Sequence, residues 1–524
     1  MRPKIIFVFL SVVFTLTSVS LSQADDSSNR YHAEYLKSKE IEANAENWIQ
    51  QRLNHFDALD RRRWLQKYKK SDAFYKHGGP VVLYVGGESR IGKLWLNSSQ
   101  LIMKTVREYG AMLFYLEHRY YGESKPTNDT SVRNLRFLSS QQALKDLVYF
   151  IQNMTEKHDG HLKKWILFGG SYPGALAVWA RLKFPHLIYG VVAASPPLEA
   201  KLFFNEYLES VNDTLYKYGG STCHSALGEA NRQIASLMET GEGKEKLRKI
   251  FNLCNASDLN GNSMGLFYSI MNNQIENVVQ YSRGNIIVDK PMYITLNKMC
   301  DILTNKSIGT EIYRLQKVID IRNNSTECIT TTFTEYTAYD RNTSWGEQSS
   351  SRVWLYQACS EFGWFQTVSR QPFQHVQESF PTALCLRLFG PELEEEDVVN
   401  GPAQTNLNYG GKKVADVVTH TVIFNGGVDP WHKVSYSKSN VRIDTEKLLS
   451  YDEEKKTISP FSNPDESNQL RKDEYFYNPF GFSSIFVAES SHAEVLSSDM
   501  QRDSIELRNS RTAILRLVSL WLGK

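Results

Sequence analysis

Short runs of consecutive apolar residues alternate with amphipathic stretches in two parts of this chain. The runs lie at 80–85, 112–116, 165–168, 190–194, 417–424 and 484–487. Helical spacing of apolar residues follows in the stretches 140–153 and 505–522. Continuous apolar strands that alternate with amphipathic helices are typical of a parallel sheet covered on both faces. The pattern therefore predicts an α/β core whose strands come from both ends of the chain.

The middle of the chain, residues 201–410, has a different pattern. Strand-like apolar runs are few there, helical periods are many, and an acidic run at 394–397 lies near its end. All six cysteines fall within it: Cys223, Cys254, Cys300, Cys328, Cys359 and Cys385. We therefore expect an α/β core in two parts, 25–200 and 411–524, with an inserted helical, disulfide-bonded cap lobe at 201–410.

The stretch from Trp165 to Phe184 joins a buried strand to an amphipathic helix around one serine. Its apolar run leads into Gly169-Gly170-Ser171, and Pro173 suits the first turn of the helix that follows. A serine on a sharp strand-to-helix turn is typical of the nucleophile elbow of hydrolases. A Gly-rich connection in any α/β protein has a similar pattern, so Ser171 is at this point a candidate nucleophile.

Two further candidates come directly after predicted strands. Asp429 follows the run at 417–424, and His492 follows the run at 484–487. The order serine, acid, histidine is that of the α/β-hydrolase fold, whose sites gather outside the carboxyl ends of the strands. In such a triad, His492 takes the proton of Ser171 and Asp429 orients the imidazole.

An oxyanion hole needs two backbone N–H groups near the nucleophile. The N–H of Tyr172, the residue after the serine, is the first expected donor. The second is expected from the turn after the run at 80–85, where Gly86 and Gly87 are the candidates.

His118 and His432 are rival bases. His118 precedes the serine, which is the wrong order for this fold, and its neighbours Glu117 and Arg119 are expected to form a buried ion pair. His432 lies on the same loop as the acid. Three candidates that each follow their own strand are harder to obtain by chance, which favours His492.

The net charge and the targeting signals limit the partners and the cellular compartment that we expect for this protein. The net charge is +2 and no basic cluster is interleaved with aromatic residues, so nucleic acid is not an expected partner. Residues 1–24 have the basic start, apolar run and small residues of a secretory signal peptide. No later segment approaches the roughly 20 apolar residues of a membrane span, so no span is expected.

Glycosylation sequons agree with that compartment. They stand at Asn97, Asn128, Asn153, Asn212, Asn255, Asn305, Asn323, Asn324 and Asn342. An even number of cysteines also favours disulfides in a secreted chain. We expect a glycoprotein of the secretory pathway, lysosomal or extracellular.

Several longer stretches resemble one peptidase family. They are GGSYPGALAVWARLKFPHLIYGVVAASPP, QQRLNHFD, VVLYVGGES, LEHRYYGES, LRFLSSQQAL, YQACSEFGWFQT, FNGGVDPWH and SSHAEVL. The family includes prolyl carboxypeptidase, dipeptidyl peptidase II and thymus-specific serine protease, and residues 175–186 look closest to the thymus-specific branch. One departure is that the family's histidine is commonly followed by aspartate, whereas His492 precedes Ala493-Glu494.

The resemblance implies an α/β-hydrolase core with a helical, disulfide-bonded cap, and a serine peptidase that cleaves next to proline. By position it supports Ser171, Asp429 and His492 as the triad. It also implies that Cys223 pairs with Cys300, Cys254 with Cys328, and Cys359 with Cys385.

Substrate recognition allows more than one interpretation. Trp431, with Trp364 from the cap, would form an apolar slot for a proline ring, although core aromatics have the same pattern. Glu88 would hold a terminal amine, or Arg119 a terminal carboxylate. Both a carboxypeptidase and a dipeptidyl peptidase therefore stay open.

The favoured function is a serine exopeptidase that acts on peptides through an acyl-enzyme. A lipase or esterase on the same fold and a non-catalytic secreted glycoprotein are the alternatives. No metal or organic cofactor is implied, and a homodimer stays open.

Overall fold

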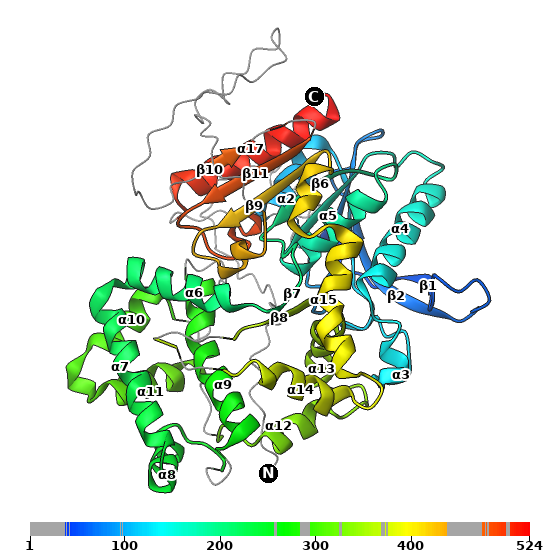
Figure 1. Cartoon of the computed structure of the whole chain (residues 1–524). Helices are drawn as coiled ribbons and strands as arrows, with labels where there is room; N and C mark the ends of the chain where they lie inside the picture. The colour runs from blue at the N-terminus through cyan, green and yellow to red at the C-terminus, as the bar shows by residue number, and fades with distance from the viewer. Residues whose placement is uncertain are drawn as a thin grey trace.

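The structure is a computed structural model that describes most of the chain (Figure 1). The described residues are 37, 39–40, 42–94, 96, 98–255, 259–282, 294–323, 327–367, 372–373, 376–436, 474–476, 478, 481–498 and 503–524. The expected signal peptide, 1–24, and two of the sequons, Asn97 and Asn324, lie outside the described residues.

A nine-stranded sheet forms the core, in the order β1-β2-β4-β3-β5-β6-β9-β11-β10. Its strands are β1 (Asn47–Arg52), β2 (Arg63–Ser71), β3 (Val81–Val85), β4 (Met112–Leu116), β5 (Trp165–Gly170), β6 (Ile188–Ala194), β9 (Thr421–Gly426), β10 (Glu474–Phe476) and β11 (Phe482–Val487). Neighbours from β4 to β11 are parallel. Antiparallel pairs stand at both edges, with β1 and β2 at one and β10 at the other. The mostly parallel sheet of the predicted fold class is confirmed.

Each predicted apolar run forms one strand of the parallel section. The run at 417–424 forms a strand only from Thr421, because the N–H groups of Val417 and Val418 donate to the Val414 carbonyl oxygen at the end of a 3-10 helix, η4 (Gly411–Asp416). The hairpin of β1 and β2 was not predicted. The basic run at 61–63 leads directly into this hairpin, since Arg63 begins β2.

Helices cover both faces of the sheet. Alternate side chains of a strand point to opposite faces, so in β5 Leu167 packs toward α4 (Ser140–Lys157) and α5 (Tyr172–Lys183). Its neighbour Phe168 packs toward α2 (Leu101–Tyr109) and α17 (Ile505–Leu522). The predicted helices of 140–153 and 505–522 are α4 and α17.

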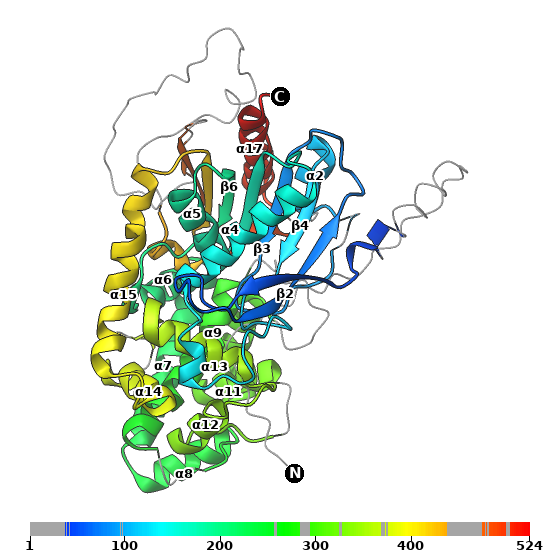
Figure 2. The same cartoon turned by 90° about the vertical axis from the view of Figure 1, so that its right-hand side faces the viewer.

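A helical region is inserted between β6 and β9, and Figures 1 and 2 show it gathered at one end of the sheet. Its elements are β7 (Lys201–Phe203), α6 (Asn205–Thr214), η1 (Leu215–Gly219), α7 (Gly220–Met238), α8 (Gly241–Ile250), α9 (Gly261–Gln280), α10 (Leu296–Thr304), η2 (Lys306–Ile308), α11 (Glu311–Asn323), α12 (Phe333–Asp340), α13 (Ser349–Gln357), η3 (Ala358–Phe362), β8 (Gly363–Phe365), α14 (Ser379–Phe389) and α15 (Glu395–Tyr409). Strands β7 and β8 form a small parallel sheet. Helix α15 extends back along the core in both views, and its Tyr409 stacks on Trp179 of α5 at 4.2 Å between ring centroids.

Three disulfides lie within the helical region. Cys223–Cys300 joins α7 to α10, Cys254–Cys328 joins the segments that follow α8 and α11, and Cys359–Cys385 joins η3 to α14. Their Cα–Cα distances are 5.2, 4.9 and 5.6 Å. This is the pairing that the family resemblance implied. The bridges tie the helices to one another and not to the sheet.

The prediction that Glu117 and Arg119 form an ion pair with each other is wrong. Both side chains are fully buried after β4, but the Arg119 guanidinium binds Asp146 of α4, with Nε to Oδ2 at 2.6 Å. The Glu117 carboxylate instead accepts hydrogen bonds from the N–H groups of Ile91 and Ser124. Arg119 therefore fastens a helix to the sheet.

None of the described helices is both long enough and apolar enough to cross a bilayer.

Candidate active site

Ser171 stands on the sharp turn between β5 and α5. Its backbone has φ 57° and ψ −134°, a strained conformation for a residue with a side chain. Its N–H donates to the carbonyl oxygen of Ala194 in β6 at 2.8 Å, which fixes the turn against the sheet. A Cβ on Gly169 would lie 2.3 Å from the Pro173 carbonyl oxygen, so the strand and helix approach this closely only with glycine there. The turn has the form of a nucleophile elbow.

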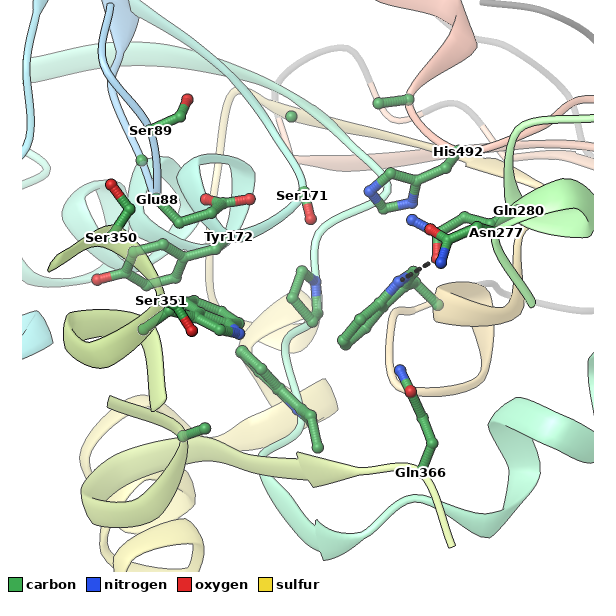
Figure 3. Close-up of a pocket in the computed structure, with 18 of the residues that line it drawn as sticks. Glu88, Ser89, Ser171, Tyr172, Asn277, Gln280, Ser350, Ser351, Gln366 and His492 are labelled. Carbon is green, nitrogen blue, oxygen red and sulfur yellow. Dashed lines mark hydrogen bonds between the residues drawn. The ribbon is translucent and has the colours of Figure 1, made fainter. Parts of the chain in front are cut away.

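Asp429 and His492 meet in space, although they follow different strands. Asp429 is fully buried after β9, and its Oδ2 lies 2.8 Å from Nδ1 of His492, which follows β11. Its other oxygen accepts the N–H of Trp431 at 3.0 Å. Figure 3 shows one nitrogen of the His492 ring on the side of Ser171. The structure thus brings Asp429 and His492 into contact, and His492 lines the same pocket as Ser171.

The loop after His492 departs from the family pattern but is well anchored. The acidic residue after His492 is Glu494 and not an aspartate. Its Oε2 accepts hydrogen bonds from the Ser491 N–H and the Ser490 hydroxyl, both at 2.8 Å. The N–H of Ala493 donates to the Ser195 hydroxyl at 2.9 Å. These bonds anchor the loop that carries His492, although no aspartate follows the histidine.

The two expected oxyanion donors lie on facing turns. Tyr172 begins α5, and its side chain is fixed by hydrogen bonds with Gln357 at 3.0 Å and His118 at 3.1 Å. After β3, the N–H of Gly86 is already donated to the carbonyl oxygen of Leu116 at 2.9 Å. Gly87 is therefore the better second candidate, and it lies against the elbow.

Replacing Gly87 by Ala is expected to lower kcat/KM by about 100-fold, the usual cost of losing one oxyanion donor. The new Cβ would lie 2.2 Å from Cγ of Pro173, so the turn must move away from the elbow. Gly241→Ala is the matched control, because its Cβ would meet nothing within 4 Å. Steady-state kinetics on the folded variants checks the prediction, and an unchanged kcat/KM for Gly87→Ala would contradict it.

The rival bases lie away from the serine. His118 is buried, its Nδ1 lies 2.7 Å from the Arg119 carbonyl oxygen, and burial lowers its pKa to about 4. His432 is also buried, with Nδ1 2.6 Å from the carbonyl oxygen of Asp429. Neither lines the pocket that contains Ser171.

A pocket of about 340 Å³ opens beside Ser171, between the sheet and the helical region. The three predicted substrate-binding residues, Glu88, Trp431 and Trp364, all line it. Arg119 does not, because its guanidinium is buried against Asp146 and the Phe137 carbonyl oxygen. The expectation that Arg119 could hold a substrate carboxylate is therefore wrong.

Aromatic rings from both parts of the fold form one wall of this pocket. Trp364 stacks on Phe362 at 4.7 Å and meets the Trp431 ring edge-to-face at 5.7 Å. The Trp364 indole N–H donates to the Glu199 carbonyl oxygen at 2.9 Å, which fixes the ring plane. The wall therefore offers the apolar surfaces of two perpendicular indole rings to the pocket.

Glu88 supplies a carboxylate to the same pocket. Its side chain is half-buried, and Figure 3 shows it on the other side of Ser171 from His492. Burial raises the pKa of Glu88, and the positive charge of a protonated His492 opposes that rise. A cationic group of a substrate would stabilise its ionised form.

Polar side chains of α9 also reach the pocket, and no sequence motif indicated them. Asn277 and Gln280 line it, and both are buried (Figure 3). In the sequence they are polar positions of an amphipathic helix, which usually face solvent.

The sheet with its elbow serine and the Asp429–His492 pair define an α/β-hydrolase of the serine hydrolase class. Residues 51–449 match the family described as Serine carboxypeptidase S28, and the chain belongs to this family of serine peptidases. It is 33% identical to thymus-specific serine protease of Homo sapiens over 412 residues, which cover 75% of this chain and 77% of that protein. The mouse protein of the same name is 33% identical over 410 residues, 75% of this chain and 78% of its own length. Lysosomal Pro-X carboxypeptidase of Homo sapiens is 28% identical over 404 residues, 73% of this chain and 77% of that protein.

Proposed function

We propose that this serine peptidase is an exopeptidase that cleaves peptides next to proline, with Ser171, Asp429 and His492 as its triad. The observation that carries the proposal is the 2.8 Å contact between Asp429 and His492, since His492 lines the same pocket as the elbow serine. The chain's membership of the S28 family supports the peptidase chemistry.

The reaction would run through an acyl-enzyme. Ser171 Oγ attacks the scissile carbonyl carbon while His492 accepts its proton, and Asp429 stabilises the imidazolium. The N–H groups of Tyr172 and Gly87 would bind the oxyanion. His492 then protonates the leaving amine, and a water molecule activated by the same imidazole releases the acyl group from Ser171.

A preference for proline is supported by the aromatic wall. The rings of Trp364 and Trp431 meet edge-to-face at 5.7 Å, and a pyrrolidine ring can pack between such surfaces without a hydrogen-bond donor. One relative carries the name lysosomal Pro-X carboxypeptidase, which agrees with this preference.

Of the two exopeptidase modes, release from the N-terminus is favoured by Glu88. A half-buried carboxylate close to the nucleophile would pair with the α-amine of a bound peptide. Arg119, the residue considered for a terminal carboxylate, is buried away from the pocket. We therefore propose a dipeptidyl peptidase in preference to a carboxypeptidase.

Two reporter sets test these proposals on the purified mature protein at pH 5 and pH 7, with Ser171→Ala as the blank. We expect serine-dependent cleavage of Xaa-Pro-reporter substrates with free N-termini and little of peptides that end in Pro-Xaa. Glu88→Gln should raise KM for the first set about tenfold. N-acetylated versions of the same substrates are the matched control, since the substitution should leave their weak turnover unchanged.

Other outcomes separate the alternatives. Cleavage of only the second set would establish a carboxypeptidase. Turnover of simple esters but of neither peptide set would favour an esterase. A folded protein that acts on nothing would favour the non-catalytic glycoprotein.

We further propose that residues 201–410 act as a cap over the core parts 25–200 and 411–524. Entry into the secretory pathway would use residues 1–24 as a signal peptide, and delivery would be lysosomal or extracellular. Among the described sequons, Asn128, Asn255, Asn305 and Asn342 are exposed and are the first expected sites of glycosylation.

A further inference from the structure

Gln280 is the last residue of α9 and lies where the helical region meets the triad loops. It is 4% exposed, and its carbonyl oxygen accepts the N–H of His492 at 3.0 Å. Its side-chain Oε1 accepts the indole N–H of Trp431 at 3.2 Å, the bond drawn in Figure 3. The same oxygen accepts the hydroxyl of Tyr207, and Nε2 donates to the Tyr281 hydroxyl at 2.7 Å.

These contacts reach both loops that the proposed triad depends on. Trp431 has two anchors, because its backbone N–H donates to Asp429 Oδ1 at 3.0 Å while its indole N–H donates to Gln280. His492 has its backbone held by the Gln280 carbonyl oxygen and its ring held by Asp429. One residue of the helical region thus bonds to the acid's loop and to the base.

We propose that Gln280 is a positioning residue, which orients Asp429 and His492 by bonding to both of their loops. The inference rests on the proposed triad and deepens it, since the base is fully oriented only when α9 is docked. The helical region then takes part in catalysis through α9, in addition to lining the pocket.

The chemistry of an amide suits this place. Oε1 must accept from two donors, an indole N–H and a phenol, while Nε2 donates to a third group. A methionine has nearly the same volume but would leave the donors of Trp431 and Tyr207 without their acceptor. A glutamate keeps the acceptor and adds a negative charge near the imidazole.

The charges around the imidazole determine the direction of the effect. His492 is faced by Asp429, by Glu88 across the serine and by the ring of Tyr281, whose centroid is 5.8 Å away. The Gln280 side chain is faced by Tyr207 and Tyr281, with Glu276 one turn earlier on α9. A carboxylate at 280 would stabilise the protonated imidazole, which is inactive as a base, so activity would begin at a higher pH.

The test compares pH profiles of kcat/KM for the unmodified protein, Gln280→Glu and Gln280→Met. We expect Gln280→Glu to move the acid limb up by about one pH unit and to keep most of kcat above it. Gln280→Met should lower kcat 10- to 100-fold with little change in KM and no shift of the limb. Gln274→Met is the matched control, since Gln274 is buried on the same helix and bonds Arg322, away from the triad.

A second readout separates this inference from the proposed function. The rate at which a phosphonate labels Ser171 is measured over the same pH range. If the unmodified protein neither turns over substrate nor takes label, the proposed triad fails. If it reacts normally while Gln280→Glu leaves the limb in place, or Gln280→Met loses no more kcat than Gln274→Met, the positioning role of Gln280 is overturned.

Discussion

Asp429→Asn is expected to lower kcat by about 10⁴-fold and to leave KM nearly unchanged. The Asp429 carboxylate lies 2.8 Å from Nδ1 of His492, and in the proposed triad it keeps the proton on Nδ1, so that Nε2 is the base for Ser171. An amide at 429 can present an N–H to Nδ1, so the proton moves to the other nitrogen and the imidazole faces Ser171 as a donor. The fully buried side chain keeps its size, so the fold should survive.

Steady-state kinetics on the best reporter substrate measures this effect. Asp416→Asn is the control, because Asp416 is exposed at the end of η4 and an Asp-to-Asn change there removes the same charge. Circular dichroism and thermal unfolding verify that both variants are folded. A kcat for Asp429→Asn within tenfold of the unmodified protein would mean that another group orients the base.

The free energy of unfolding is expected to fall by about 3 kcal/mol between pH 6.5 and pH 8. Three carboxyl groups of the helical region cause the fall: Glu276 and Asp340 are buried and Glu361 is half-buried. Burial raises the pKa of Glu276 to about 8 and the pKa values of Glu361 and Asp340 to about 7. Each group is protonated in the folded chain at a pH where the unfolded chain has released that proton.

The sign follows from proton linkage. The three carboxyl groups stabilise the folded chain fully below their pKa values in the unfolded chain, near 4. This stabilisation is lost as the pH rises through their pKa values in the folded chain. His118 has the opposite effect, since burial lowers its pKa from 6.5 to about 4. Its contribution makes the free energy of unfolding rise between about pH 4 and pH 6.5 and changes little above pH 6.5. Above pH 6.5 the three carboxyl groups contribute more than His118 to the pH dependence of stability, so the free energy of unfolding should decline.

Thermal unfolding at constant ionic strength from pH 5 to pH 8.5 measures the decline. Glu276→Gln should flatten the curve above pH 6.5, because it removes the group with the highest raised pKa. Glu245→Gln, at a half-buried position of α8, should leave the slope as it is. A midpoint that rises with pH over this range would contradict the prediction.

Much of the core was predictable because its physical signals are local. The runs that became β3, β4, β5 and β6 are apolar on both faces, and such strands need no alternating pattern to be recognised. The contact between Asp429 and His492 was predictable from chain order, because each residue follows the carboxyl end of its own strand. The disulfide pairing came from the family resemblance and not from cysteine spacing.

The features that were not predicted depend on contacts between distant residues. Strand β2 carries Lys67 and Lys69, which look like surface residues in the sequence, yet both are buried and their amines reach Glu46 and the Gly92 carbonyl oxygen. Arg119 found its partner on α4 instead of two residues away. Gln280 is a polar residue at a helix end, and only the folded chain shows which loops it meets.

The insertion between β6 and β9 has a consequence for synthesis of the chain. These strands pair directly in the sheet, but the whole segment 195–420 must be made between them. Until β9 emerges, β6 is an open parallel edge with apolar side chains on both faces, the kind of edge that pairs with other chains. We expect the nascent chain to depend on chaperone binding at this edge, and on prompt oxidative folding of the helical region, for productive closure of the sheet.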